Sequence, residues 1–478
     1  MRALILLLLA ASSAAITARA EIRLPKLVGD HMVLQRDLPI HVWGWADPGE
    51  AITISFNGES YQVTADESGD WEAILRKMKA GGPYEMVLEG TNRIALQDIL
   101  IGDIWVCSGQ SNMQWTVKNS NDSDEEIKNA SYPEIRLFYV KRTTSAVPVD
   151  DVSGQWEVCS PETVPGFSAV GYFFGREIHK SEGVPIGLIN TSWGGTVVET
   201  WISPEGLRGE ETFGPRAASV KDLDKEAVTK PNSHPTLLYN AMIHPLLNFP
   251  IKGAIWYQGE SNATRAYQYR DLFPRMIRDW RAKWQQGDFP FLFVQLANFR
   301  KPLEEPKPSD WAELREAQDM TLQLKNTGMA SAIDIGEADD IHPRNKQEVG
   351  RRLALSARKL VYGDNVIASG PRYKSMKIKN GDVFITFSDT GKGLKSKDGA
   401  PGLEEFQLAG EDKQFHWAEA EIIGKNKVKV HAAGVDKPVA VRFAWQNNPS
   451  KLNLYNSEDL PANPFRTDQW PGMTAGNK

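Results

Sequence analysis

The feature that most constrains the fold is an alternation of short apolar runs with longer helical stretches between about residues 103 and 361. The apolar runs predict strands at 104–107, 186–189, 254–257, 291–296 and 330–335. The stretches between and after them predict helices at 170–181, 237–247, 267–284, 312–324 and 346–361. Near-continuous apolar strands that alternate with helices are typical of a parallel sheet covered on both faces. The active site of such a sheet lies at the carboxyl ends of its strands.

Strand-like segments flank this region on both sides. Residues 41–45, 51–56 and 84–88 alternate or cluster apolar and β-branched residues, with turn residues between them. The chain returns to strand-like alternation at 383–387 and 439–443. We therefore expect, after a leader over 1–20, an N-terminal β-sandwich domain over 21–100, an α/β domain over 101–363 and a C-terminal β-rich domain over 364–478.

The first twenty residues have the pattern of a signal peptide. Arg2 is followed by a short apolar run, and Ala18-Arg19-Ala20 has the small-x-small form of a cleavage site. The run is shorter than the roughly 20 residues that a membrane-spanning helix needs. We expect cleavage before Glu21, export to the periplasm or the extracellular medium, and no membrane partner.

Charge and cysteine content exclude other classes of protein. Loss of Arg2 and Arg19 with the leader moves the formal net charge from -6 to -8, and no basic stretch offers a surface for nucleic acid. Cys107 and Cys159 are the only cysteines, so the chain is not a disulfide scaffold. Because Cys107 lies in an apolar run, a buried free thiol is favoured over a disulfide.

The first predicted strand of the α/β region leads directly into Gly109-Gln110-Ser111-Asn112-Met113. A serine in a glycine-flanked turn between a strand and a helix exposes its hydroxyl near backbone N–H groups, as acyl transfer requires. The same pentapeptide also fits a simple helix cap.

Two further strand ends carry polar loops. The second strand ends in residues 190–196, where Gly194 or Gly195 can donate a backbone N–H to an oxyanion, or can simply supply a turn with positive φ. The third ends in residues 256–262, which place the amides of Gln258 and Asn262 and the carboxylate of Glu260 just beyond the sheet.

A histidine follows the last predicted strand. Asp339-Asp340-Ile341-His342-Pro343 precedes the final helix of the region. A lone histidine is usually structural, but here neighbouring carboxylates can hold the imidazole in the tautomer that accepts a serine proton. Four strand-end loops thus supply a nucleophile, a base, a carboxylate and oxyanion donors.

At these residues the sequence resembles the sialate O-acetylesterase family, a branch of the SGNH hydrolases, over nearly all of the mature chain. The shared segments are 105–113, 191–196, 256–262, 340–343 and 460–466. The resemblance implies an SGNH-type, flavodoxin-like parallel sheet with helices on both faces, flanked by N-terminal and C-terminal β-sandwich-like domains.

The resemblance also implies roles for individual residues. Ser111 is the expected nucleophile and His342 the expected base. The expected oxyanion hole combines the N–H of Ser111, an N–H of Gly194 or Gly195, and an amide of Gln258 or Asn262. SGNH enzymes usually place the triad aspartate three residues before the histidine, which favours Asp339, whereas the motif of this family emphasises Asp340.

The implied mechanism is two-step acyl transfer. His342 takes the proton of Ser111 as the hydroxyl attacks an acetyl ester, and water then hydrolyses the acetyl-enzyme. This chemistry requires no metal and no organic cofactor.

Candidate sugar contacts lie in the same loops. Gln110, Trp193, Glu199 and Glu260 are expected to bind substrate, and a structural role is the alternative for the two glutamates. Four aromatic side chains lie near the site in the sequence: Trp115, Trp193, Trp201 and Tyr257. Each is expected by default to pack in the core, and the alternative is a platform for a sugar ring. Arg265 and Arg315 are candidates to bind a sugar carboxylate, although both are more typical of surface or helix ion pairs.

The expected partner is an O-acetylated glycan or sugar. O-acetylated sialic acid is the first expectation, and acetylated xylan, xyloglucan or mannan is the alternative. A protein of another class, a non-catalytic carbohydrate-binding protein built on an inactive hydrolase core, predicts binding without ester cleavage. A glycosidase with two carboxylates would leave the serine and the histidine without a role. The sequence leaves the oligomeric state open.

Overall fold

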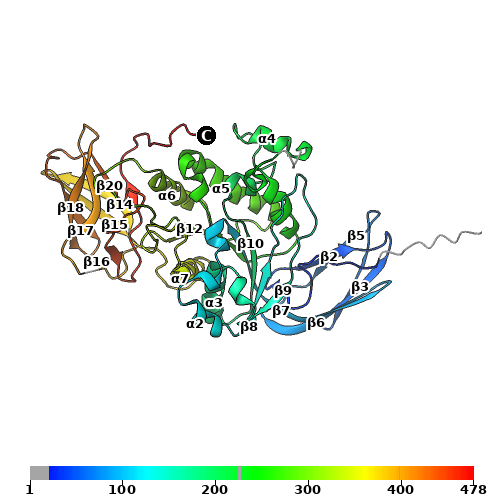
Figure 1. The fold of residues 1–478 in the computed structure, drawn as a ribbon. Coiled ribbons are helices and arrows are strands. Elements are labelled where there is room, and N and C mark those ends of the chain that lie inside the picture. The colour runs from blue at the N-terminus through cyan, green and yellow to red at the C-terminus, as the bar shows by residue number, and fades with distance from the viewer. Residues whose placement is uncertain (1–20, 224–227, 398) are drawn as a thin grey trace, which may run out of the picture.

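The computed structural model describes residues 21–223, 228–397 and 399–478. The predicted signal peptide, residues 1–20, lies outside the described residues. Figure 1 shows the N-terminal strands on one side of the molecule, a central α/β part and the C-terminal strands on the other side. Among the described residues, no helix combines the length and the apolar character needed to cross a membrane.

The central sheet confirms the expected parallel arrangement. Its strand order is β13-β12-β11-β7-β10-β8-β9, and all neighbours from β13 to β8 pair in parallel. Only the last pair, β8 with β9, is antiparallel within this path. The strands are β7 (Arg93–Gly109), β8 (Tyr132–Tyr139), β9 (Trp156–Cys159), β10 (Ile186–Ser192), β11 (Gly253–Tyr257), β12 (Phe291–Gln295) and β13 (Thr327–Ser331).

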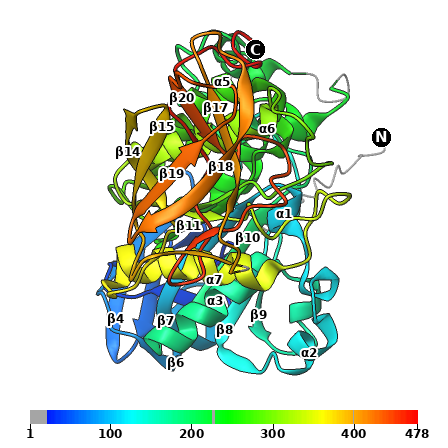
Figure 2. The same ribbon diagram turned by 90° about the vertical axis from the view of Figure 1, so that its left-hand side faces the viewer.

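Helices lie on both faces of this sheet. Trp105 of β7 packs edge-on against Phe174 of α3, and Trp256 of β11 packs against Trp280 of α5 on the opposite face. Figure 2 shows α7 beside α3. The longer helices are α3 (Ala169–Glu182), α5 (Ala266–Trp284), α6 (Asp310–Met320) and α7 (Lys346–Ala357), and the short ones are α1 (Ser111–Gln114), α2 (Ser123–Lys128) and α4 (Gly214–Ala218).

Side-chain caps set where three of these helices begin. The hydroxyls of Ser168 and Ser309 accept backbone N–H groups at the starts of α3 and α6, and the amide oxygen of Asn345 does the same for α7. Such caps satisfy N–H groups that have no partner within the helix. The N-cap residue of α7, Asn345, lies three residues beyond His342, so this cap also anchors the loop that carries the histidine.

Two predicted elements are wrong in part. The strand expected at 330–335 is β13, which spans Thr327–Ser331. The apolar run extends beyond the strand because Ile333 packs into the C-terminal core. The helix expected at 237–247 is a π-helical turn, Tyr239–Ile243, followed by the 3-10 turn His244–Leu246. Pro245 cannot donate the hydrogen bond that a continuous α-helix requires.

Most of the N-terminal strands are continuous with the central sheet, whereas β2 and β5 form a separate two-stranded sheet. β7 pairs with β6 and β1 through its first part and with β10 and β11 through its last part. It therefore crosses the expected boundary at residue 100 without a break. The other N-terminal strands are β1 (Val33–Gln35), β2 (Ile40–Trp45), β3 (Ala51–Phe56), β4 (Glu59–Thr64), β5 (Asp70–Leu75) and β6 (Gly81–Glu89).

The C-terminal part is an antiparallel sheet with its own core. Its order is β14-β15-β19-β18-β17-β20-β22, and β16 pairs separately with β21. Its core includes Phe387, Phe406 and Phe443. The strands are β14 (Arg372–Lys379), β15 (Asp382–Ser388), β16 (Leu394–Ser396), β17 (Leu403–Ala409), β18 (Phe415–Gly424), β19 (Lys427–His431), β20 (Ala440–Phe443), β21 (Leu454–Asn456) and β22 (Phe465–Arg466).

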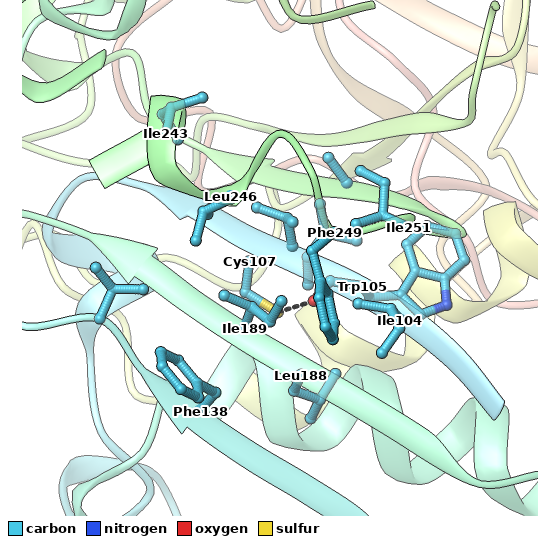
Figure 3. Packing of buried hydrophobic residues seen from close by; sticks show 14 of the residues in the cluster. Ile104, Trp105, Cys107, Phe138, Leu188, Ile189, Ile243, Leu246, Phe249 and Ile251 are labelled. Carbon is cyan, nitrogen blue, oxygen red and sulfur yellow. Dashed lines mark hydrogen bonds between the residues drawn. The ribbon is translucent and has the colours of Figure 1, made fainter. Parts of the chain in front are cut away.

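Both cysteines are buried free thiols, as expected. Figure 3 shows Cys107 among Ile104, Leu188 and Ile189, with its thiol directed at the carbonyl oxygen of Trp105, 3.8 Å away. Burial raises the pKa of both thiols, to about 12 for Cys159. A neutral, buried thiol is not a reactive nucleophile, so neither cysteine competes with Ser111.

Candidate active site

Ser111 and His342 lie in hydrogen-bond contact at the carboxyl edge of the central sheet. Ser111 is the first residue after the turn that ends β7, and Gly109 in that turn has a φ of 134°. A Cβ at Gly109 would lie 2.2 Å from the carbonyl oxygen of Tyr257, so only glycine fits there. His342 lies in the loop between β13 and α7, and its Nε2 is 2.9 Å from Ser111 Oγ. This is the contact that a serine nucleophile and its general base require.

The carboxylate beside the imidazole belongs to Asp340. Its Oδ1 lies 3.5 Å from His342 Nδ1 and accepts a 2.8 Å hydrogen bond from the His342 backbone N–H. Asp339, which the spacing rule favoured, is exposed. The geometry therefore favours Asp340 over Asp339 as the partner of the histidine, because the turn at Asp340 brings its carboxylate beside the imidazole.

Trp115 covers one face of His342. The two rings stack with centroids 4.9 Å apart and planes 13° apart. The pKa of His342 is lowered by burial, and the charge of Lys346 acts in the same direction, against the opposing effect of Asp340. The imidazole thus remains a neutral proton acceptor to lower pH than an exposed histidine.

The backbone of Gly194 lies next to Ser111. A Cβ added there would meet Ser111 Cβ at 3.2 Å, and the Gly194 N–H donates a 2.8 Å hydrogen bond to Oε1 of Gln114. The amide oxygen of Gln114 thus occupies the position of an acceptor beside Ser111. Gly195 is exposed, with a φ of 74°, and a Cβ on it would meet nothing within 4 Å. Of the two expected glycines, Gly194 is the one near Ser111.

The two expected amides are buried and differ in their free donors. Gln258 Nε2 donates to the carbonyl oxygen of Thr196 and to Asn262 Oδ1, which uses both of its protons. Asn262 Nδ2 donates one hydrogen bond, to Glu199, within the described part of the chain. Asn262 therefore retains the greater capacity to donate to a ligand.

Glu199 and Arg265 form an ion pair behind the site. Glu199 is 3% exposed, and its oxygens accept from Arg265 at 2.7 Å and from Asn262 at 3.1 Å. Glu199 was expected to bind sugar hydroxyls or to be structural, and Arg265 was a candidate for a sugar carboxylate, with an ion pair favoured. Their mutual contact places them to orient the amide of Asn262.

Arg315 is also absent from the surface of the site. Its guanidinium is fully buried and donates to the carbonyl oxygens of Leu296, Ala297, Gln446 and Asn447 at 2.8–3.0 Å. These bonds join the end of β12 to the loop after β20. Arg315 is therefore neither a surface ion-pair residue nor a ligand for a sugar carboxylate.

The side chains of Gln110 and Glu260 connect the turn around Ser111 with the loop after β11. Gln110 is 3% exposed, and its side-chain oxygen accepts the backbone N–H of Gly259 at 3.3 Å. Glu260 Oε1 accepts a 2.6 Å hydrogen bond from Asn112, and burial raises the pKa of Glu260. Both expected sugar contacts therefore connect loops within the protein.

The aromatic residues divide into core and surface. Trp201 and Tyr257 are fully buried, whereas Trp115 and Trp193 are partly exposed. Trp193 follows β10 and adjoins Gly194, so it borders the reacting residues. The guanidinium of Arg142, which follows β8 at the same sheet edge, lies 5.9 Å from the centre of the Trp193 ring.

Sequence reasoning missed Gln114, whose amide oxygen contacts Gly194, and three further residues of this site. Arg142 is exposed, and within the described ranges the structure gives it no ion pair. Asn112 and Lys346 are buried and bonded to each other behind Ser111. One signal for Lys346 was available: a lysine at the first position of a helix opposes the helix dipole, which is unusual without another reason.

Comparisons with known proteins agree with this geometry. Residues 101–359 match the family described as carbohydrate esterase, sialic acid-specific acetylesterase. The chain is 33% identical to human sialate O-acetylesterase, over 94% of each chain, and 32% identical to the mouse protein, over 93% of this chain and 94% of that one.

A solved structure extends the likeness to the fold. The crystal structure of a carbohydrate acetylesterase from Xanthomonas citri shares 42% identity and a TM-score of 0.87, and the match covers 94% of this chain and all of that one. The resemblance in the sequence is thereby confirmed. The chain belongs to the sialic acid-specific acetylesterase family of carbohydrate esterases and is a carboxylic ester hydrolase.

Proposed function

We propose that this enzyme is a serine esterase of the SGNH type that removes O-acetyl groups from sialic acid. The observation that carries the proposal is the 2.9 Å contact between Ser111 Oγ and His342 Nε2 at the strand ends of the central sheet. The relatives named sialate O-acetylesterase support the choice of substrate.

Ser111 is the proposed nucleophile and His342 the general base. The imidazole takes the hydroxyl proton as Oγ attacks the acetyl carbonyl carbon, and returns it to the sugar oxygen that leaves. A water molecule then loses a proton to the same nitrogen and attacks the acetyl carbon. The bond to Ser111 Oγ breaks, Oγ takes the proton back from the imidazolium, and acetic acid leaves as acetate. Asp340, at 3.5 Å, stabilises the imidazolium that forms in both steps.

The proposed oxyanion donors are the backbone N–H of Ser111, the N–H of Gly194 and the amide of Asn262. In this state the amide oxygen of Gln114 accepts from Gly194, and a carbonyl oxygen of the substrate would replace it. Asn262 is preferred over Gln258 because both amide protons of Gln258 are engaged. Neutral donors fixed before the reaction stabilise charge that develops in the transition state.

Arg142 and Trp193 support an anionic sugar as the substrate. Sialic acid carries a carboxylate, and a guanidinium can hold such a group with two hydrogen bonds. Arg142 lies over the ring of Trp193, whose neighbour Gly194 adjoins Ser111. In this arrangement the indole would contact the sugar ring while Arg142 binds its carboxylate.

The proposal is tested by acetate release from three substrates. We expect purified residues 21–478 to hydrolyse a chromogenic acetyl ester and O-acetylated sialic acid. In Ser111→Ala, we expect both activities to be at least about 1000-fold lower than in the parent. Ser68→Ala, at an exposed serine in the N-terminal part, is the matched control and should keep full activity.

Each alternative has its own outcome in this assay. Preference for acetylated xylan, xyloglucan or mannan fragments would assign a hemicellulose substrate and leave the serine mechanism intact. Full activity of Ser111→Ala would overturn the mechanism. Glycan binding with no ester cleavage by the parent protein would identify a non-catalytic carbohydrate-binding protein.

We also propose that the enzyme is exported and acts outside the cytoplasm. The support is the charged start, apolar run and small-x-small site of residues 1–20. Export would place the esterase where extracellular glycans occur. N-terminal sequencing of the protein recovered from outside the cytoplasm should begin at Glu21, and a chain that retains Met1 would contradict the proposal.

A further inference from the structure

A fully buried lysine lies behind the two proposed catalytic residues. Lys346 is the first residue of α7, and its Nζ donates a 2.5 Å hydrogen bond to Asn112 Oδ1. Lysine is rarely fully buried, and a positive charge at a helix N-terminus opposes the helix dipole. Local stability therefore does not explain why a lysine begins this helix.

Asn112 connects the segments that carry the reacting groups. It follows Ser111 directly, and its Nδ2 donates a 3.0 Å hydrogen bond to the carbonyl oxygen of Ile341, the residue before His342. The same nitrogen donates to Glu260 at 2.6 Å. The amide can make these bonds only while its oxygen faces the other way, toward the ammonium group of Lys346.

We propose that Lys346 is a positioning residue, which fixes the alignment of Ser111 and His342 by holding the amide of Asn112. The ammonium group selects one orientation of the amide, and the amide then holds the Ile341 carbonyl against the nucleophile turn. Lys346 does not touch the substrate in this arrangement. The proposal rests on the proposed esterase chemistry of Ser111 and His342.

The charge of Lys346 gives the proposal a second readout. Burial lowers the pKa of Lys346 to about 7, and burial also lowers the pKa of His342 below its ordinary value of 6.5. Lys346 therefore keeps its proton over most of the range in which His342 gains one. A positive charge nearby disfavours the imidazolium, so the lysine helps to keep the base neutral.

Other charged and titratable groups surround this pair. Asp340, Glu337 and Arg344 lie in the loop of His342, where Arg344 contacts both acids, at 3.6 Å and 2.9 Å respectively. Glu260 faces Lys346 from the segment after β11, and the ring of Tyr257, at the end of that strand, lies 5.3 Å from Nζ. All of these groups are retained in Lys346→Met, so a change in its pH dependence reports the loss of the lysine.

The first test is Lys346→Met, assayed with a chromogenic acetyl ester across pH. We expect kcat to fall about 10- to 100-fold, because a misaligned base loses transition-state stabilisation, while KM stays within about threefold. The acid limb of kcat/KM should move to higher pH, since loss of the positive charge raises the pKa of His342. Leu353→Ala, at a buried residue of the same helix, controls for destabilisation and should leave kcat and the acid limb unchanged.

The second test is Asn112→Asp, which is isosteric. A carboxylate still accepts from Lys346 but cannot donate to the Ile341 carbonyl or to Glu260, so both of these bonds break while the lysine keeps its partner. We expect a fall in kcat similar to that of Lys346→Met.

Clear outcomes would overturn the proposal. If both single variants keep kcat within twofold of the parent, Lys346 does not position the reacting groups. If kcat falls equally in Leu353→Ala and the acid limb of Lys346→Met is unmoved, Lys346 is only structural. If Lys346→Met fails to fold, Asn112→Asp decides alone. Full activity of Ser111→Ala would instead refute the proposed function itself, which separates the two failures.

Discussion

The indole of Trp115 stacks on the imidazole of His342, with ring centroids 4.9 Å apart and planes 13° apart. Trp115 lies in the segment of the nucleophile, four residues after Ser111, and His342 lies in the loop before α7. The nucleophile segment thus contacts the base twice, once through the serine hydroxyl and once through this aromatic face.

Trp115→Ala should therefore change the pH dependence of the enzyme. Burial lowers the pKa of His342, so exposure of its ring should raise that pKa toward its ordinary value. The acid limb of kcat/KM, which reports the free enzyme, should move to higher pH, and activity below about pH 6.5 should fall most. Trp45→Ala, at a partly exposed tryptophan of β2, should leave the limb in place. An unmoved limb in Trp115→Ala would show that stacking does not set this pKa.

Neighbouring aspartates offer a matched pair of substitutions. Asp340→Asn should lower kcat about 100-fold, because the neutral amide no longer stabilises the imidazolium beside it. Asp339→Asn, at the exposed neighbour, should stay within about twofold of the parent. Steady-state kinetics with one chromogenic ester measures both, and a reversed order would return the role to Asp339.

The two glycines of the loop after β10 can be separated by substitution with alanine. Gly194→Ala places a methyl group 3.2 Å from Ser111 Cβ, so kcat should fall about 10-fold or more. Gly195→Ala meets nothing within 4 Å but forces alanine to a φ of 74°, so it should cost about 1 kcal/mol of stability with little change in kcat. Kinetics and thermal unfolding of both variants test this division, which equal losses of kcat would contradict.

Arg142→Ala tests whether the substrate is anionic. KM for O-acetylated sialic acid should rise about 10-fold, because a charge-assisted bidentate contact is lost, while kinetics on a neutral chromogenic ester should not change. Arg208→Ala, at an exposed arginine after the β10 segment, is the control. Equal KM values for the parent and Arg142→Ala would remove the support that Arg142 gives to a sialic acid substrate.

The sequence predicted most of the central sheet because its strands are apolar throughout. β8 and β9 were not predicted, since Pro133, Glu134 and Arg136 interrupt the apolar pattern of β8. Arg136 is nevertheless buried, because it pairs with Asp98 of β7 at 2.7 Å. A pairing between residues so distant in the sequence is set by tertiary structure and leaves no periodic signal.

The candidate site was likewise predicted in part from the sequence, and the rest of it depended on tertiary contacts. Ser111 lies just after β7 and His342 lies in the loop between β13 and α7, so the parallel topology predicted that the two residues meet at one edge of the sheet. The choice between Asp339 and Asp340 depended on a local turn, in which Asp340 accepts the backbone N–H of His342. Burial of Glu199 and Lys346 depended on partners in other loops, which residue type and spacing do not reveal.

The continuity of β7 has a practical consequence for domain exchange. Because one strand of 17 residues belongs to both the N-terminal sheet and the central sheet, a cut near residue 100 would sever hydrogen-bonded ladders on both sides of it. A graft that keeps the esterase intact must therefore carry its N-terminal strands with it.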